Sequence, residues 1–77
     1  MVTNLERLAA GKTAVVVGFD GGHGLLGKAD AMGLRVGKKL RKLSSQLMAG
    51  PVTVIMDGRQ LAMGRGIARK ILVKAAD

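Results

Sequence analysis

The sequence predicts a mainly β fold, a small five-stranded β-barrel with one or two short helices, formed by residues 1–77 as a single domain. Residues 13–19 form a β-branched apolar run that is too short for a typical helix. Residues 52–56 alternate with a two-residue period, and Asp57-Gly58 follows them as a dipeptide typical of tight hairpin turns. Short strands of this kind favour a closed or nearly closed barrel, because closure leaves few exposed edges.

The first predicted element is a short helix near the N-terminus. Leu5, Leu8 and Ala9 have the i, i+3, i+4 spacing of one helix face, and Thr3 or Asn4 precedes them as a candidate cap. We therefore expect one or two helical turns before the strand over 13–19.

A second helix is predicted after that strand. Leu25, Ala29 and Met32 recur at i, i+4 and i+7, and Gly33 supplies a residue that readily adopts the left-handed conformation at a helix end. Leu34 would then fold back against the helix.

The middle of the chain fits two structures. Leu40, Leu43 and Leu47 match one face of a basic amphipathic helix, whereas Gly37 and Pro51 bracket the segment like the ends of a strand. Periodicity alone leaves both alternatives open.

The last third of the chain predicts two more strands. Residues 59–63 continue the hairpin after Asp57-Gly58, and the glycines that follow end that strand. Ile67-Ala68 then suits one helical turn, and residues 71–73 suit a final short strand.

Composition limits the function. Lys and Arg number 13 against 5 Asp and Glu, which gives a formal net charge of +8 and favours acidic partners. Without cysteine the chain has neither disulfides nor thiolate metal sites. We find no signal-peptide pattern and no apolar run long enough to span a membrane, and we expect a cytoplasmic protein.

Residues 22–27 match the pattern G-x-G-x-x-G between a predicted strand and a predicted helix. A dinucleotide site would also need an acidic residue about 20 positions further on and a doubly wound sheet, and this chain offers neither. We therefore interpret the glycines as a tight strand-to-helix turn. A looser anion site at the helix N-terminus remains an alternative.

The chain has few side chains of the kinds that catalyse reactions or bind metal ions. His23 is the only histidine, and Asp20 is the other candidate ligand beside it, whereas zinc sites need three or four ligands. We interpret His23 as a solvated loop residue and predict no catalytic residues, no metal site and no cofactor. The few carboxylates also disfavour paired acid and base chemistry.

The run Lys38-Lys39-Leu40-Arg41-Lys42 places four cations in five residues. It is either a solvated basic face or a surface that attaches to an acidic one. Phe19 is the only aromatic residue, which argues against base stacking by RNA and against docking of polyproline peptides. For a partner surface we select the second helix and the segment 44–49, through Leu25, Leu26, Ala29, Met32, Leu47 and Met48.

Several motifs, in order, resemble one known family. The chain has an opening L-x-x-L-x-x-G, a first strand, the motif M-G-L-x-x-G and three further strand segments, at Leu5 to Gly11, Ala14 to Gly18, Met32 to Gly37, Gly50 to Val52, Leu61-Ala62 and Ile71 to Val73. This order resembles the ferrous iron transport protein A (FeoA) family of small bacterial SH3-like barrels. The chain departs from the family pattern at Val36, Lys42 and Gly64.

The resemblance implies an SH3-like barrel with a strand in the ambiguous middle segment. It also implies a cytoplasmic accessory protein without enzymatic activity, which regulates ferrous iron uptake by contacting the GTPase portion of the membrane transporter FeoB. Two alternatives stay open: a basic nucleic-acid-binding module, favoured by the charge of +8, and an iron-sensing domain like the C-terminal barrels of iron-dependent repressors.

Overall fold

The computed structural model describes residues 1–43 and 50–76. Six strands and two short helices follow one another as β1 (Val2–Asn4), β2 (Thr13–Phe19), α1 (His23–Ala31), β3 (Lys39–Lys42), β4 (Val52–Met56), β5 (Arg59–Met63), α2 (Arg65–Ala68) and β6 (Ile71–Ala75). The mainly β prediction is confirmed.

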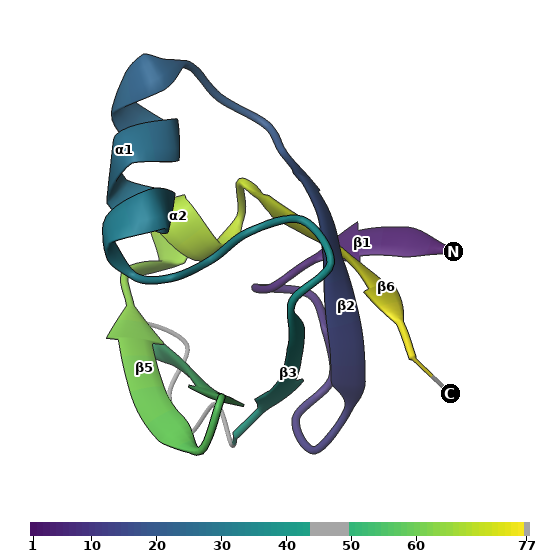
Figure 1. Ribbon diagram of the computed structural model, residues 1–77. Coiled ribbons are helices and arrows are strands. Elements are labelled where there is room, and N and C mark those ends of the chain that lie inside the picture. Colours follow the sequence, from purple (N-terminus) through teal and green to yellow (C-terminus); the bar gives the residue numbers. More distant parts are fainter. Residues whose placement is uncertain (44–49, 77) are drawn as a thin grey trace.

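The strands form one curled antiparallel sheet in the order β1-β6-β2-β3-β4-β5 (Figure 1). The sheet has six strands where the sequence predicted five, because residues 2–4 add a strand beside β6. It is also not closed in the described part of the chain, since β1 and β5 stand at its two ends. The expectation of a nearly closed SH3-like fold agrees with this curled sheet.

The predicted N-terminal helix is reduced to a single turn. Asn4 caps this turn, because its Oδ1 accepts a hydrogen bond from the Arg7 backbone N–H at 2.9 Å and its carbonyl oxygen accepts one from the Leu8 N–H at 2.9 Å. The turn buries Leu5 and Leu8 in the core. Gly11, at φ +85°, then reverses the chain toward β2.

The middle segment is a strand, at least over β3, whose residues pair with β2 on one side and β4 on the other. Leu40 and Lys42 face inward, while Lys39 and Arg41 are exposed, so the two-residue period applies here. The resemblance therefore resolved correctly an ambiguity that periodicity left open.

The hairpin of β4 and β5 is confirmed in detail. Asp57 and Gly58 both have positive φ, at 53° and 75°, as a type I′ turn requires. Met56 pairs with Arg59 across this turn, and the register continues without a shift to Val52 and Met63.

The helix α1 ends as predicted, in a Schellman motif. Gly33 adopts φ +81°, and the Leu34 N–H donates to the Ala29 carbonyl oxygen at 2.8 Å. Leu34 is also buried, so its backbone hydrogen bond and its apolar side chain both stabilise the end of the helix. The predicted turn at Ile67-Ala68 is also present, as α2.

One cluster of apolar side chains fills the inside of the curled sheet under α1 and α2. Its members are Leu5, Leu8, Ala14, Val16, Leu25, Ala29, Leu34, Leu40, Val52, Val54, Met56, Met63, Ala68, Ile71 and Val73. The tips of β4 and β5 and the C-terminal end of α1 meet at the margin of this cluster, and the candidate site lies there.

Candidate protein-binding groove

The floor of the groove is formed by three apolar side chains from three elements. Met32 is the C-terminal cap residue of α1, Met56 is the last residue of β4, and Leu61 lies in the middle of β5. Met56 is buried, whereas Met32 and Leu61 are partly buried and pack against the core. The floor is therefore an outward continuation of the core.

The backbone at Gly33 sets the distance between the helix and the hairpin. A Cβ atom at Gly33 would lie 3.5 Å from the Met56 Cε, so the chain passes close to the β4 methionine directly after the helix. The positive φ at Gly33 turns the chain away directly after Met32. Together these two features leave the Met32 side chain at the surface beside the hairpin.

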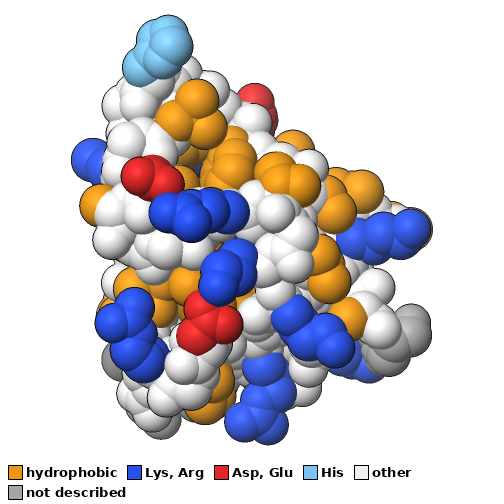
Figure 2. Space-filling view, in the orientation of Figure 1, with side chains coloured by type: hydrophobic (Ala, Val, Ile, Leu, Met, Phe, Trp, Pro, Cys, Tyr) orange, Lys and Arg blue, Asp and Glu red, His pale blue; other side chains and the backbone are white. Residues whose placement is uncertain are grey.

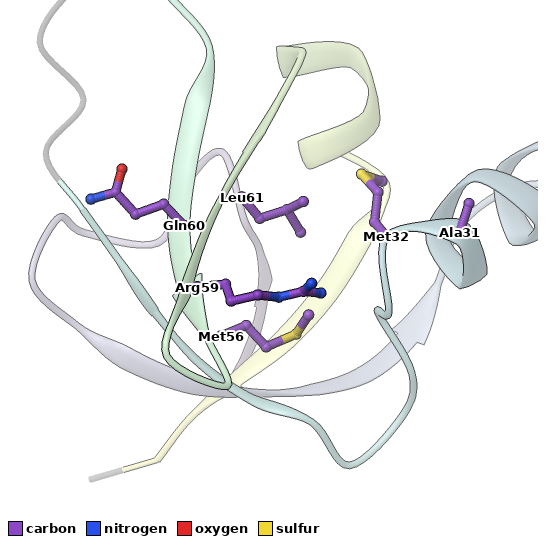
Figure 3. Close-up of a pocket in the computed structure, with 6 residues that line it drawn as sticks. All are labelled: Ala31, Met32, Met56, Arg59, Gln60 and Leu61. Carbon is purple, nitrogen blue, oxygen red and sulfur yellow. The ribbon is translucent and has the colours of Figure 1, made fainter.

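The rim adds Ala31, Arg59 and Gln60, and the groove has a volume of about 290 Å³. Figure 3 shows the side chains of Arg59 and Leu61 directed toward Met56 and Met32, while Gln60 points the other way. This is the alternation expected of a strand. Arg59 thus sets a guanidinium group beside the apolar floor of the groove.

The arrangement suits binding of an apolar side chain with a carboxylate close by. Methionine side chains are flexible and polarisable, so a floor with two of them can adapt to partners of different shape. Arg59 can hold a carboxylate with two parallel hydrogen bonds. Within residues 1–43 and 50–76, no three His, Cys, Asp or Glu side chains lie close enough to hold a metal ion.

The residues selected from the sequence separate into three groups. Leu25 and Ala29 face the core, at 9% and 1% exposure, so they offer little surface to a partner in this conformation. Leu26 is 44% exposed, and Met32 lines the groove. Leu47 and Met48 lie outside the described residues.

Sequence reasoning missed Met56, Arg59 and Leu61 as groove residues. Met56 belongs to the buried core, and only 5% of its surface is exposed. The available signal was the hairpin itself, because a two-residue turn after Met56 places Arg59 opposite it and Leu61 two residues further on the same face.

His23 and the glycine pattern contribute nothing to this groove. His23 begins α1 and is exposed, and Gly22, Gly24 and Gly27 face open space rather than a close backbone approach. A dinucleotide turn requires parallel strands around it, and the pairs that β2 makes with β3 and β6 are antiparallel. The interpretation as a strand-to-helix turn therefore holds.

A polar cluster on another part of the surface surrounds Glu6. The Glu6 carboxylate accepts hydrogen bonds from Arg69, at 3.2 Å to Nε and 3.3 Å to Nη2, and lies 3.8 Å from the Arg65 Nη1. The hydrogen bonds from Arg69 hold the pKa of Glu6 below its usual 4.5, against partial desolvation. The Nζ of Lys42, on β3, donates a hydrogen bond to the backbone carbonyl oxygen of Glu6.

Lys42 is one of the three positions at which the chain departs from the family pattern. Its side chain is charged and yet buried, at 2% exposure. Burial lowers the pKa of its ammonium group below 10.5, and the Arg65 guanidinium lowers it further, while Glu6 acts in the opposite direction. The cluster joins the N-terminal turn, β3 and α2. Its hydrogen bonds and ion pairs connect these parts of the chain, so we assign the cluster to the fold.

No helix within residues 1–43 and 50–76 is both long and apolar enough to cross a bilayer. In the described residues, six short antiparallel strands, two short helices and a small groove with an apolar floor define a small SH3-like β domain. The sequence profile of the FeoA domain matches residues 3–75, nearly the whole chain. The chain belongs to the FeoA domain family.

Known relatives agree with this assignment. A candidate Fe(2+) transport protein A of Methanocaldococcus jannaschii is 36% identical over 67 residues, which cover 87% of this chain and 79% of the relative. The crystal structure of an iron uptake regulatory protein, FeoA, has a TM-score of 0.88 at 32% identity, with 97% of each chain covered.

The fold also occurs inside a larger protein. The manganese regulator SloR matches with a TM-score of 0.84 and 25% identity, over 95% of this chain but 34% of the regulator. A FeoA-like protein from Clostridium acetobutylicum, 20% identical with a TM-score of 0.87, shows the same fold.

Proposed function

We propose that this protein is a cytoplasmic accessory protein of ferrous iron uptake, which acts by binding the GTPase portion of the membrane transporter FeoB. The similarity to an iron uptake regulatory protein and to a candidate Fe(2+) transport protein supports the role in iron uptake. The groove between α1 and β5 carries the proposal of binding, because it joins an apolar floor to an arginine at its mouth.

The electrostatics favour an acidic partner. The formal net charge is +8, and Arg59 forms no ion pair with the described residues. A charged residue at the rim of an interface mainly increases the association rate and selects against partners of the same sign. An acidic face on the transporter would therefore be attracted and then oriented by Arg59.

We further propose that the protein has no catalytic activity of its own. The sequence offers one histidine, no cysteine and five carboxylates. Three of those carboxylates, Glu6, Asp30 and Asp57, already form ion pairs with basic side chains. Regulation by contact requires none of these groups.

The test combines iron uptake with binding. Ferrous iron uptake should fall in cells that lack this protein, and the purified transporter should bind the wild-type chain. Arg59→Glu should weaken binding about tenfold or more, which corresponds to about 1.4 kcal/mol. Lys74→Glu changes the net charge equally on β6, away from the groove, and should bind almost as the wild type does. Unchanged uptake together with absent binding would refute the proposal.

A second candidate function rests on the outer face of β3. Lys39 and Arg41 are exposed there and lie in the middle of the sheet, where Arg41 pairs with Thr13 and Ile55. Such a face can attract the phosphates of RNA or DNA. Tight binding of either at physiological salt, lost in Arg41→Glu and weakening steeply as salt rises, would favour this function over transporter binding.

A further inference from the structure

The strand β5 forms one end of the sheet. Among residues 1–43 and 50–76 it pairs only with β4, so one of its two sides is an edge. An edge strand presents backbone N–H and C=O groups that another chain can pair with.

The hairpin turn identifies the groups that face outward. In a two-residue type I′ hairpin, the residues that flank the turn, Met56 and Arg59, form a hydrogen-bonded pair. Hydrogen-bonded and non-hydrogen-bonded pairs then alternate along the ladder. Leu61 therefore directs its N–H and C=O toward β4, whereas Gln60 and Ala62 direct theirs to the free edge. Both Gln60 and Ala62 are exposed.

Within the part of the chain that the structure describes, this edge lacks the usual protection against strand pairing. Natural edges are blunted by short strands, bulges, prolines, charges or a covering segment. The opposite edge, β1, has only three residues. By contrast β5 has five residues, its register with β4 shows no shift, and it contains no proline and no charged residue after Arg59. Another extended segment can therefore form backbone hydrogen bonds with this regular edge strand.

The groove lies along the same strand. Arg59, Gln60 and Leu61 are consecutive residues of β5, and all three line it. A strand that paired with Gln60 and Ala62 would alternate its own side chains above and below the sheet. Those on the inner side would reach the floor formed by Met32, Met56 and Leu61, so one bound strand would use both the backbone edge and the groove.

Charge indicates the composition of that strand. Arg59 stands at one side of the groove, and Lys28 lies on α1 at i−3 from Ala31 and i−4 from Met32, on the same helix face. Figure 2 shows apolar side chains in the space between the helix and the hairpin, with several basic side chains and fewer acidic ones around them. A second copy of this chain would bring its own charge of +8 to this place. The surface instead fits an acidic segment.

We propose that β5 binds its partner by strand addition: an extended segment of the transporter, with alternating apolar and acidic residues, pairs with the backbone of Gln60 and Ala62. The apolar side chains enter the groove, and the acidic ones meet Arg59 and Lys28. The proposal rests on the proposed function for the identity of the partner. Its mode of binding rests on the edge geometry alone.

Amide hydrogen exchange on the wild-type chain, alone and with the purified full-length transporter, tests this mode directly. In the free protein the Gln60 and Ala62 amides should exchange fast, and the Leu61 amide should be protected. In the complex the Gln60 and Ala62 amides should slow by about tenfold or more, because both become hydrogen-bonded. Docking through side chains alone would leave these two amides fast and would overturn the proposal.

A pair of variants at Ala62 provides the second measurement. Ala62→Pro removes the outward N–H without touching a bond to β4 and should weaken transporter binding about tenfold. Ala62→Val keeps the N–H, suits a strand and should bind like the wild type. Circular dichroism checks that both variants are folded. Equal affinities for the two variants would contradict strand addition.

The outcomes separate this inference from the proposed function. Binding of the transporter without protection of Gln60 and Ala62 would leave the proposed function standing and refute strand addition. Absence of binding would refute both. Protection that grows with the concentration of the free protein would show that a second copy occupies the edge, which would overturn the choice of an acidic partner.

Discussion

The Nζ of Lys42 lies 2.7 Å from the backbone carbonyl oxygen of Glu6, across 36 residues of sequence. This bond ties β3 to the turn that follows β1. The side chain of the same Glu6 binds Arg69, next to α2, so one residue connects the N-terminal turn to two other parts of the fold through its backbone and its carboxylate. A buried lysine in a small core is costly, and its effect on stability should depend on pH.

Replacement of Lys42 by methionine removes this titratable group while keeping an unbranched side chain. Because the folded pKa of Lys42 is lowered below 10.5, the unfolded chain holds the proton more firmly. Stability rises with pH where the unfolded state binds more protons, which here is the range from the folded pKa up to 10.5. The wild type should therefore gain stability relative to Lys42→Met as pH rises through that range.

Urea unfolding of the two proteins at pH 7 and at pH 10.5 measures this difference. Lys74→Met, on the exposed end of β6, controls for the loss of one positive charge. A difference between wild type and Lys42→Met that stays constant over this range would show that burial does not disfavour the charged form.

Glu6→Gln should remove a contribution that also grows as pH rises, but in the acid range. The pKa of Glu6 is lowered below 4.5, chiefly by the hydrogen bonds from Arg69, so its carboxylate stabilises the fold above pH 4.5. That contribution is lost as pH falls through the folded pKa. The variant should have a lower Tm than the wild type at pH 7, and the two values should converge in acid.

Thermal unfolding from pH 7 to pH 2 follows this convergence. Asp30→Asn breaks the pair with Arg35, whose side chains are 70% and 69% exposed, and serves as the matched carboxylate control. It should change stability by less than about 1 kcal/mol at any pH, as exposed ion pairs do. An equal effect of both variants would argue against a special role of Glu6.

How far the sequence could predict the fold depends on the range of the interactions that decide each element. The hairpin was predictable, because Asp57-Gly58 determines its turn locally. The N-terminal strand was not, because Val2 and Thr3 are extended only through pairing with Lys74 and Val73. Pairing between distant segments leaves no local signal.

The candidate site was predictable only in part for the same reason. Periodicity identified Met32 as a residue of the apolar helix face, and Gly33 as the end of the helix. Arg59 and Leu61 lie across the groove from Met32 only because α1 packs against the hairpin. The local sequence does not specify this packing. Lys42 shows the limit most clearly, because its acceptor is a backbone oxygen 36 residues away.

Gly58→Ala should destabilise the hairpin. Gly58 has φ +75°, and an L-residue in the left-handed region costs roughly 1–2 kcal/mol, although no atom lies within 4 Å of a Cβ placed there. The loss is thus one of backbone strain and not of steric overlap. Urea unfolding should show a lower midpoint with an unchanged m-value. Gly64→Ala, also in open space but without positive φ, is the matched control and should cost less.

Alanine at Gly24 and Gly27 should have the opposite effect and stabilise the protein. Both glycines lie within the nine residues of α1, both face open space, and neither has a positive φ. Glycine in a helix interior is about 0.5–1 kcal/mol less favourable than alanine, because the unfolded chain loses more freedom when glycine folds. Each substitution should therefore raise the free energy of unfolding by about that amount.

Thermal and urea unfolding of the two single variants and of the double variant measure these gains. Gly21→Ala provides the contrast, because a Cβ there would lie 2.6 Å from the Leu25 Cδ2 and would disturb a core side chain. We expect Gly21→Ala to be neutral or destabilising while the other two stabilise. A loss of stability in Gly24→Ala or Gly27→Ala would mean that the open side of α1 is covered in solution, since the described structure leaves room for both methyl groups.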